Sequence, residues 1–432
     1  MKGYALASVM LLLSCGGDKL HTSQGDASRE EAGVLDGWTE VSPAPGAPDS
    51  GVASDGGGVS PGTSFAPCAN GGVPPYSLAC TGLYADIATK TVASGVRFYQ
   101  PAVPLWSDNS QKMRWIQIPP GTQIDASNPS EWAFPVGTKV WKEFSRDGKR
   151  IETRLFQKVD NGPPPIWHHT TYAWTADESA AFSSGGGDIQ LDSDGGTYHI
   201  PIPAECDKCH NGRTDHLLGF EQVSLGLQGA QGLTLPELAK EGLIAPVPTM
   251  LQSTIGDDGT GAAAPALAWI HINCGVTCHN ANSNATAYGV KMHLRLDPML
   301  LDGRPVTVSD FDTLKTTIGA LATSPAWVSP VHWTRIVPGD PSKSLLVQLI
   351  SNRGKNNPAK GQMPPIASLV VDTVDVAKVV DWVSKMSAVQ TIDGGLDAGA
   401  EATVGTNQDA QSDGTTGDAA GDAPTDAAPR GQ

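Results

Sequence analysis

The chain has few basic residues and few cysteines, and its hydrophobic run at the start is short. It holds 29 Lys and Arg against 45 Asp and Glu, for a formal net charge of −16 over 432 residues. Such an acidic balance argues against a nucleic-acid partner, because nucleic-acid phosphates attract basic surfaces. Most of the excess acidity lies at the two ends, so the middle is nearly balanced. The chain is long enough for more than one domain and a sizeable core.

Both ends almost lack aromatic and large aliphatic side chains. Residues 42–62 and 393–429 are mostly Gly, Ala, Ser, Thr, Pro and Asp. Such segments cannot bury enough apolar surface to offset the entropy of ordering. We therefore predict disordered termini: a linker over 16–66 and an acidic tail over 389–432.

The first fifteen residues, MKGYALASVMLLLSC, have a different composition. A basic Lys2 precedes an apolar run over residues 4–13, which is too short to span a bilayer and predicts an export signal over 1–15. The ending LLSC resembles a bacterial lipobox, so we expect a lipid anchor at Cys15; a plain secretory signal is the alternative. Gly16 follows the cysteine instead of the aspartate typical of inner-membrane retention in enteric bacteria. We expect attachment to the outer membrane, facing the periplasm or the cell surface.

The other six cysteines form three pairs. In an oxidising compartment free thiols do not persist, so each pair needs a use. Cys68 and Cys80 flank a Gly/Pro-rich loop with no adjacent histidine, which predicts a local disulfide. The other two pairs run directly into a histidine, in CDKCH at 206–210 and in NCGVTCHN at 273–280.

CDKCH is the full C-x-x-C-H pattern of covalent haem attachment. The thiols of Cys206 and Cys209 would add across the haem vinyl groups, and His210 would become the proximal iron ligand. A zinc site is the main competitor, but it would need further ligands from NCGVTCHN. The pattern predicts haem c.

NCGVTCHN has three residues between its cysteines where two are usual. Cys274 and Cys278 would hold a second haem, with His279 as proximal ligand, if the extra residue forms a bulge. The alternatives are a Cys274–Cys278 disulfide beside an incidental histidine, or a zinc site that joins both motifs.

The flanking sequence favours haem at the second motif. A helix is predicted before it, with Pro265 near its start. Far downstream, Met363 precedes two prolines in GQMPP, and such a rigid loop suits a distal iron ligand; a core or loop methionine is the alternative. The sequence after it predicts a helix whose N-cap is Asp372 or Thr373. This order resembles a class I cytochrome c domain, which we place at 262–388.

Residues 67–202 predict an antiparallel β-domain. Short runs such as KMRWIQIP, TKVWKEF and RIETRLF are rich in aromatic and β-branched residues, and Asp147-Gly148 between two of them is a strong hairpin signal. A sandwich is the expected architecture. His168 and His169 should point to opposite faces of a strand, so they are poor partners for one metal.

The segments PLWSDNSQKMRWIQIPPGTQI, FPVGTKVWKEF and YHIPIPAECDKCHNG resemble a family of bacterial di-haem c-type cytochromes with a β-rich N-terminal region. The resemblance runs roughly over residues 99–386 and departs from the family pattern at NCGVTCHN. It implies a multidomain α+β fold, in which a β-sandwich-like domain is followed by mainly α-helical cytochrome c-like haem domains. It implies two covalent haem groups and says little about partners.

Residues 203–255 would form a first haem module. It includes a short helix in LTLPELAKEGLI, with a capping box of Thr234 and Glu237. Three residues are candidates for its distal iron ligand: Met250, His216 and His199. We choose Met250.

These features predict a lipid-anchored di-haem cytochrome that passes single electrons between redox partner proteins and meets the membrane through its lipid. Two other functions stay open. One is a di-haem peroxidase-like oxidoreductase, in which the first haem would have an open sixth site. The other is a non-haem surface binding protein whose cysteines form structural disulfides.

Overall fold

The computed structural model describes residue 68 and residues 74–190, 197–353, 359–366 and 368–387. The predicted export signal, the lipid anchor at Cys15, the linker and the acidic tail lie outside these residues. Within them, no helix has both the length and the hydropathy to cross a bilayer.

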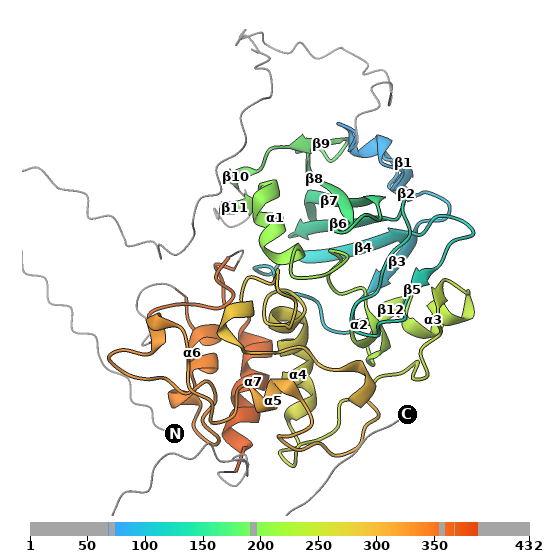
Figure 1. Cartoon of the computed structure of the whole chain (residues 1–432). Helices are drawn as coiled ribbons and strands as arrows, with labels where there is room; N and C mark the ends of the chain where they lie inside the picture. Colours follow the sequence, from blue (N-terminus) through green and yellow to red (C-terminus); the bar gives the residue numbers. More distant parts are fainter. Residues whose placement is uncertain (1–67, 69–73, 191–196, 354–358, 367, 388–432) are drawn as a thin grey trace, which may run out of the picture. The chain divides into compact units, whose positions relative to one another are not determined.

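A seven-stranded antiparallel sheet occupies the first half of the described chain (Figure 1). Its strands, in spatial order, are β12(Gln231–Gly232), β3(Arg97–Gln100), β4(Gln111–Gln117), β6(Lys139–Arg146), β7(Lys149–Asp160), β8(Ile166–Trp174) and β9(Ala181–Ser184). The predicted hairpin is confirmed, since Asp147 and Gly148 join β6 to β7 with φ angles of 50° and 78°. Both residues adopt the left-handed conformation that a tight Asp-Gly turn requires.

Among the described residues, three two-stranded ladders accompany the large sheet. They are the antiparallel pairs β1(Tyr84–Asp86) with β2(Thr91–Val92) and β10(Gly187–Gln190) with β11(Thr197–Ile200), and the parallel pair β5(Ile124–Asp125) with β13(Ile244–Ala245).

Side chains alternate along each strand, so the large sheet has two faces. Each face packs against an apolar cluster. Trp115 and Trp141 are cross-strand neighbours on one face, where residues from 78 to 96 cover them. Ile116 and Val140 are neighbours on the opposite face. The apolar cover of that face comes from the segment after the first cysteine pair: Leu217, Phe220, Leu225, Leu233, Leu235, Leu238 and Ile244.

The predicted succession of a β-sandwich-like domain and mainly α-helical cytochrome c-like domains is wrong. Among the described residues one large sheet is present, in place of two sheets packed face to face. The segment after Ile202 joins the β-structure, since β12 extends the sheet beside β3 and β13 pairs with β5. The residues that the structure describes belong to one compact unit.

The helices are short. They are α1(Pro203–His210), α2(Gln222–Gly226), α3(Leu235–Lys240), α4(Ala263–Ile270), α5(Asp312–Lys315), α6(Leu345–Ser351) and α7(Thr373–Lys385). Elsewhere, 3₁₀ turns that begin at Pro298, Pro325 and Pro341 take the place of longer helices. Proline suits the first turn of a helix and interrupts one that is already running, so these segments stay as loops with single turns.

Helix α7 packs against α4, and one carboxylate ties them together. Asp372 caps α7 by accepting from the Asp375 backbone N–H at 3.0 Å, which confirms the predicted cap. It also accepts from Nε1 of Trp269 in α4 at 3.0 Å. The buried side of α7, which includes Val376, Val379 and Val383, therefore has a fixed position on α4.

Candidate functional site

The first cysteine pair and its histidine lie together on α1. Pro203 occupies the first turn, and Oε2 of Glu205 accepts from the Ile202 backbone N–H at 3.0 Å, so the start of this short helix is well defined. Cys206 and Cys209 carry free, half-buried thiols. A single helical turn thus holds both thiols and, directly after them, His210.

The ring of His210 has a fixed orientation. Its Nδ1 lies 2.6 Å from the carbonyl oxygen of His216, so Nδ1 donates and Nε2 keeps a free lone pair. The ring stacks on Phe156 of β7, with 4.1 Å between centroids. Burial lowers the pKa of His210 to about 3 and keeps the imidazole in the neutral form that binds iron.

The second motif begins on a π-helical turn and continues into a hydrogen-bonded turn. Helix α4 continues directly into the turn η2(His271–Gly275), which contains Cys274. The Val276 N–H donates to the His271 carbonyl at 2.8 Å, and the His279 N–H donates to the Cys274 carbonyl at 2.8 Å. Both bonds span five residues, one more than in an α-helix, and a π turn is the form in which a helix accommodates one additional residue.

The π turn accounts for the unusual cysteine spacing. In CDKCH the histidine lies four residues after the first cysteine, which is one α turn. In NCGVTCHN it lies five residues after, and the backbone bond from His279 to Cys274 still closes one turn. Each motif therefore presents two thiols and an imidazole from a single helical turn. Burial lowers the pKa of His279 to about 4, although the Met292 carbonyl partly opposes this shift.

A buried hydrogen bond between a neutral imidazole and a carboxylate anchors the π turn to helix α2. Nδ1 of His271 accepts from the Leu296 backbone N–H at 3.0 Å, so its Nε2 carries the proton and donates to Oε1 of Glu221 at 3.2 Å. Glu221 is fully buried and also accepts from the backbone N–H groups of Val223 and Ser224 at the start of α2. Helix α2 and the second motif are held by the same carboxylate.

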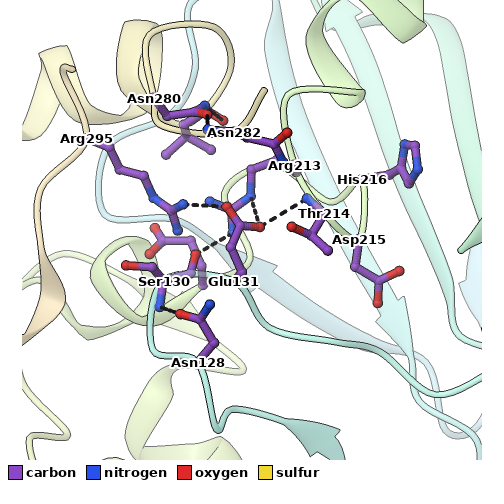
Figure 2. A network of polar contacts seen from close by, with 12 residues as sticks. Asn128, Ser130, Glu131, Arg213, Thr214, Asp215, His216, Asn280, Asn282 and Arg295 are labelled. Carbon is purple, nitrogen blue, oxygen red and sulfur yellow. Dashed lines mark hydrogen bonds and ion pairs between the residues drawn. The ribbon is translucent and has the colours of Figure 1, made fainter. Parts of the chain in front are cut away.

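A second charged cluster joins three distant segments (Figure 2). Oε1 of Glu131 accepts from Nη1 of Arg295 at 2.6 Å, and Oε2 lies 3.5 Å from Nε of Arg213. The Thr214 backbone N–H also donates to Glu131, at 3.1 Å. Nη2 of Arg213 donates to the carbonyl of Ser130 at 3.0 Å. The sequence analysis did not predict this cluster. The one feature of the sequence that points to it is Arg213, which follows His210 by three residues.

Comparison with known proteins gives no assignment. No protein-family model, no curated protein and no solved structure matches the chain. The candidate site is therefore interpreted from its own residues.

Among the predicted distal ligands, Met363 shares a large apolar cluster with the second motif. Met363 is half-buried and packs against the same apolar cluster as Cys274. Met250 lies half-buried in the loop after β13. Both ring nitrogens of His199 are hydrogen-bonded, to Asp188 at 2.7 Å and to Glu205 at 2.9 Å. The backbone carbonyl of His216 accepts the hydrogen bond from His210.

The remaining predicted residues have structural contacts. Cys68 and Cys80 are joined in a disulfide. His168 and His169 point to opposite faces of β8, as their cross-strand partners Gln157 and Phe156 show. His169 faces α1, and its Nε2 lies 3.1 Å from Oδ1 of Asp207.

The donor set does not converge on a single metal ion. Among the residues that the structure describes, no three side chains of His, Cys, Asp or Glu gather where one ion could be held, so a zinc site that joins both motifs has no ready geometry here. A groove of about 510 Å³ runs along α7, and none of the motif residues lines it. The chemistry of the site therefore depends on two separate cysteine–histidine turns.

Proposed function

We propose that the protein is a di-haem c-type cytochrome that transfers single electrons, with one haem attached covalently at each motif. One observation carries the proposal: each of two helical turns presents two free thiols and an adjacent neutral imidazole, and the π turn restores this arrangement where the spacing departs from the usual one. This donor set fits a covalently held haem. The likeness of CDKCH and its flanking strands to bacterial di-haem cytochromes supports the same function.

The chain's own residues would attach and orient the groups. The thiols of Cys206, Cys209, Cys274 and Cys278 would hold the groups, each through a C–S bond formed by addition of the thiol to a vinyl group, with the thiol hydrogen going to the other vinyl carbon. Nε2 of His210 would be the proximal ligand, since Nδ1 is held by the carbonyl of His216. His279 would have the same role at the second turn, and Met363 would be the distal ligand there. Haem iron, when bound, supplies a reversible one-electron change.

The proposal includes a place for the protein in the cell. A lipid at Cys15 would anchor it to the outer membrane, and residues 16–66 would tether the folded part. Covalent attachment suits an exported electron carrier, which would otherwise lose its cofactor by dilution. Its partners would be redox proteins that donate or accept one electron at a time.

The first test is the number of covalent haem groups per chain. The protein is produced together with a cytochrome c maturation system, and haem is measured by the pyridine haemochrome assay against the polypeptide concentration. We expect two haem groups per chain, one in the Cys206→Ala/Cys209→Ala variant, and one in the Cys274→Ala/Cys278→Ala variant. The matched control is Cys68→Ser/Cys80→Ser, which removes the disulfide and should keep two. A chain without covalent haem would refute the proposal and favour a surface binding protein.

The distal ligand has its own test. In the Met363→Ala variant we expect loss of the methionine–iron charge-transfer band of the oxidised protein and a lower reduction potential for one haem, because the thioether favours the reduced iron. The control is Met299→Ala, since Met299 is exposed on a 3₁₀ turn. An unchanged band would exclude Met363 as the ligand and leave the rest of the proposal standing.

A further inference from the structure

One loop of the large sheet contacts both the second motif and the segment that follows Met363. The loop joins β3 to β4, and Trp106 lies in it. The backbone N–H of Trp106 donates at 2.7 Å to Oδ1 of Asn273, the residue directly before Cys274. Its indole Nε1 donates at 2.9 Å to the carbonyl of Val370, in the segment after Met363. A single residue of the β-region is therefore hydrogen-bonded to both.

The carboxylate of Asp108, in the same loop, holds the backbone of that segment. Its Oδ1 accepts from the backbone N–H groups of Leu369 and Val370, both at 2.9 Å, and its Oδ2 lies 2.9 Å from the first of these nitrogens. The side chains of Leu369 and Val370 are 68% and 42% exposed, so burial of apolar surface does not fix this segment. Charge-assisted hydrogen bonds to one carboxylate fix it instead.

The loop is bent so that it presents this carboxylate. Asp108 and Asn109 have φ angles of 46° and 63°, in the left-handed region, which Asp and Asn adopt more readily than other residues with a side chain. The Ser110 N–H closes the turn by donating to the Ser107 carbonyl at 2.8 Å. Such a conformation persists only where the surrounding structure holds it, and it is concentrated at sites where geometry matters for function.

The segment held by Asp108 is connected in turn to Met363. Nε2 of Gln362, the residue directly before Met363, donates to the Ser368 carbonyl at 2.9 Å. The same nitrogen lies 3.2 Å from the carbonyl of Pro364, directly after Met363. One side-chain amide thus ties the residues on both sides of Met363 to Ser368, which adjoins the two residues that Asp108 holds.

We propose that Trp106 and Asp108 are positioning residues for Met363: the β3–β4 loop holds the methionine loop beside the second motif and so keeps its thioether available as the distal ligand. This inference rests on the proposed function. Neither residue is itself a ligand, because each acts through hydrogen bonds to the protein backbone or to Asn273. The β-region thereby takes part in the second site without contributing a donor to it.

The test compares Asp108→Ala with Asp108→Asn in the holoprotein. Asparagine keeps one carbonyl oxygen, which can accept from both N–H groups as Oδ1 does, whereas alanine keeps none. Imidazole added to the oxidised protein competes with the thioether. In Asp108→Ala we expect its apparent affinity to rise by about tenfold, since one hydrogen bond to a charged group is worth at least that factor. The methionine–iron charge-transfer band should weaken and the reduction potential of one haem should fall, and Asp108→Asn should restore nearly wild-type behaviour.

A second variant and a control accompany this pair. Trp106→Phe keeps the backbone bond to Asn273 and loses the indole bond to Val370, so it should shift imidazole affinity in the same direction by a smaller factor. It also tests the inference if Asp108→Ala fails to fold. The control is Asp86→Ala, because the carboxylate of Asp86 likewise accepts from a backbone N–H, that of Ala88 at 2.9 Å, but lies in β1. It should change neither the band nor the affinity.

Haem content and Met363→Ala separate the possible failures. Two haem groups per chain and loss of the band in Met363→Ala, with unchanged band and imidazole affinity in Asp108→Ala and Trp106→Phe, would overturn the inference and leave the proposed function standing. Equal effects of Asp108→Ala and Asp108→Asn would also overturn it, because the hydrogen bonds would then not position the thioether. Fewer than two haem groups in the wild-type chain would overturn both.

Discussion

Replacing Glu221 by glutamine should destabilise the fold far more than a change of one charge at the surface. Glu221 is fully buried and accepts three hydrogen bonds: from Val223 N–H at 2.8 Å, Ser224 N–H at 2.7 Å and His271 Nε2 at 3.2 Å. In glutamine one oxygen becomes an NH₂ group, which cannot accept a hydrogen bond. A lost hydrogen bond to a buried charged group costs about 1.5–3 kcal/mol, and the weakened pairing with His271 adds to it. We expect the free energy of unfolding to fall by about 2–4 kcal/mol.

The measurement is urea unfolding followed by circular dichroism. The matched control is Glu241→Gln, which breaks a surface ion pair with Arg97 whose side chains are 30% and 42% exposed. Exposed pairs contribute about 0–1 kcal/mol, so this control should change the unfolding midpoint little. If Glu221→Gln costs no more than the control, the carboxylate does not hold the second motif on helix α2.

The same carboxylate predicts a dependence on pH. Burial by itself would raise the pKa of Glu221, but the hydrogen bond from His271 and the charges of Arg295 and Arg213 lower it well below its usual range. A lowered pKa in the folded state means that ionised Glu221 stabilises the fold above the unfolded pKa of about 4.3, and that this stability is lost as the pH falls. The difference in unfolding free energy between wild type and Glu221→Gln should therefore shrink below about pH 4. A difference that stays constant down to pH 3 would contradict this account.

Three further predictions concern other parts of the fold. Lys158→Met should cost about 3–5 kcal/mol in urea unfolding, because it leaves Asp215 charged and buried without the ammonium 2.6 Å away; an unchanged midpoint would contradict this. Gly148→Ala should cost about 1 kcal/mol in thermal unfolding, because φ is +78° in the β6–β7 turn, and Gly185→Ala, at an open position without a positive φ, should cost less. The pKa of His199 is raised by hydrogen bonds to Glu205 and then Asp188, so its stabilising effect is present below about pH 6.5 and is lost as the pH rises. Nuclear magnetic resonance titration should show this pKa falling in Glu205→Gln.

Features that depend on neighbouring residues could be predicted from the sequence. The Asp147-Gly148 turn and the cap at Asp372 each follow from a few adjacent residues. The predicted helix after Thr234 is present as α3, but the side chain of Thr234 makes no capping bond, so the expected capping box does not form.

Features that depend on distant pairing could not be predicted. Strand β12 has two residues, Gln231 and Gly232, and no periodic pattern marks it as the edge of the large sheet. Glu131 and Arg295 are 164 positions apart, so no spacing rule connects them. The helical character of the second half was overestimated because isolated apolar runs indicate helices without showing how soon a proline or a turn ends them.

The π turn restricts how the cysteine spacing of the second motif can change. Gly275 sits so close to the carbonyl of Leu294 that a Cβ atom there would lie 2.3 Å from its oxygen. Deleting one residue of this turn would restore the common cysteine spacing but would rotate everything upstream by about 100° about the helix axis. His271 would then turn away from Glu221, and the apolar side of α4 would turn away from α7. The longer spacing is thus fixed by contacts of residues outside the cysteine–histidine motif, so the motif can adopt the ordinary spacing only if the surrounding core changes at the same time.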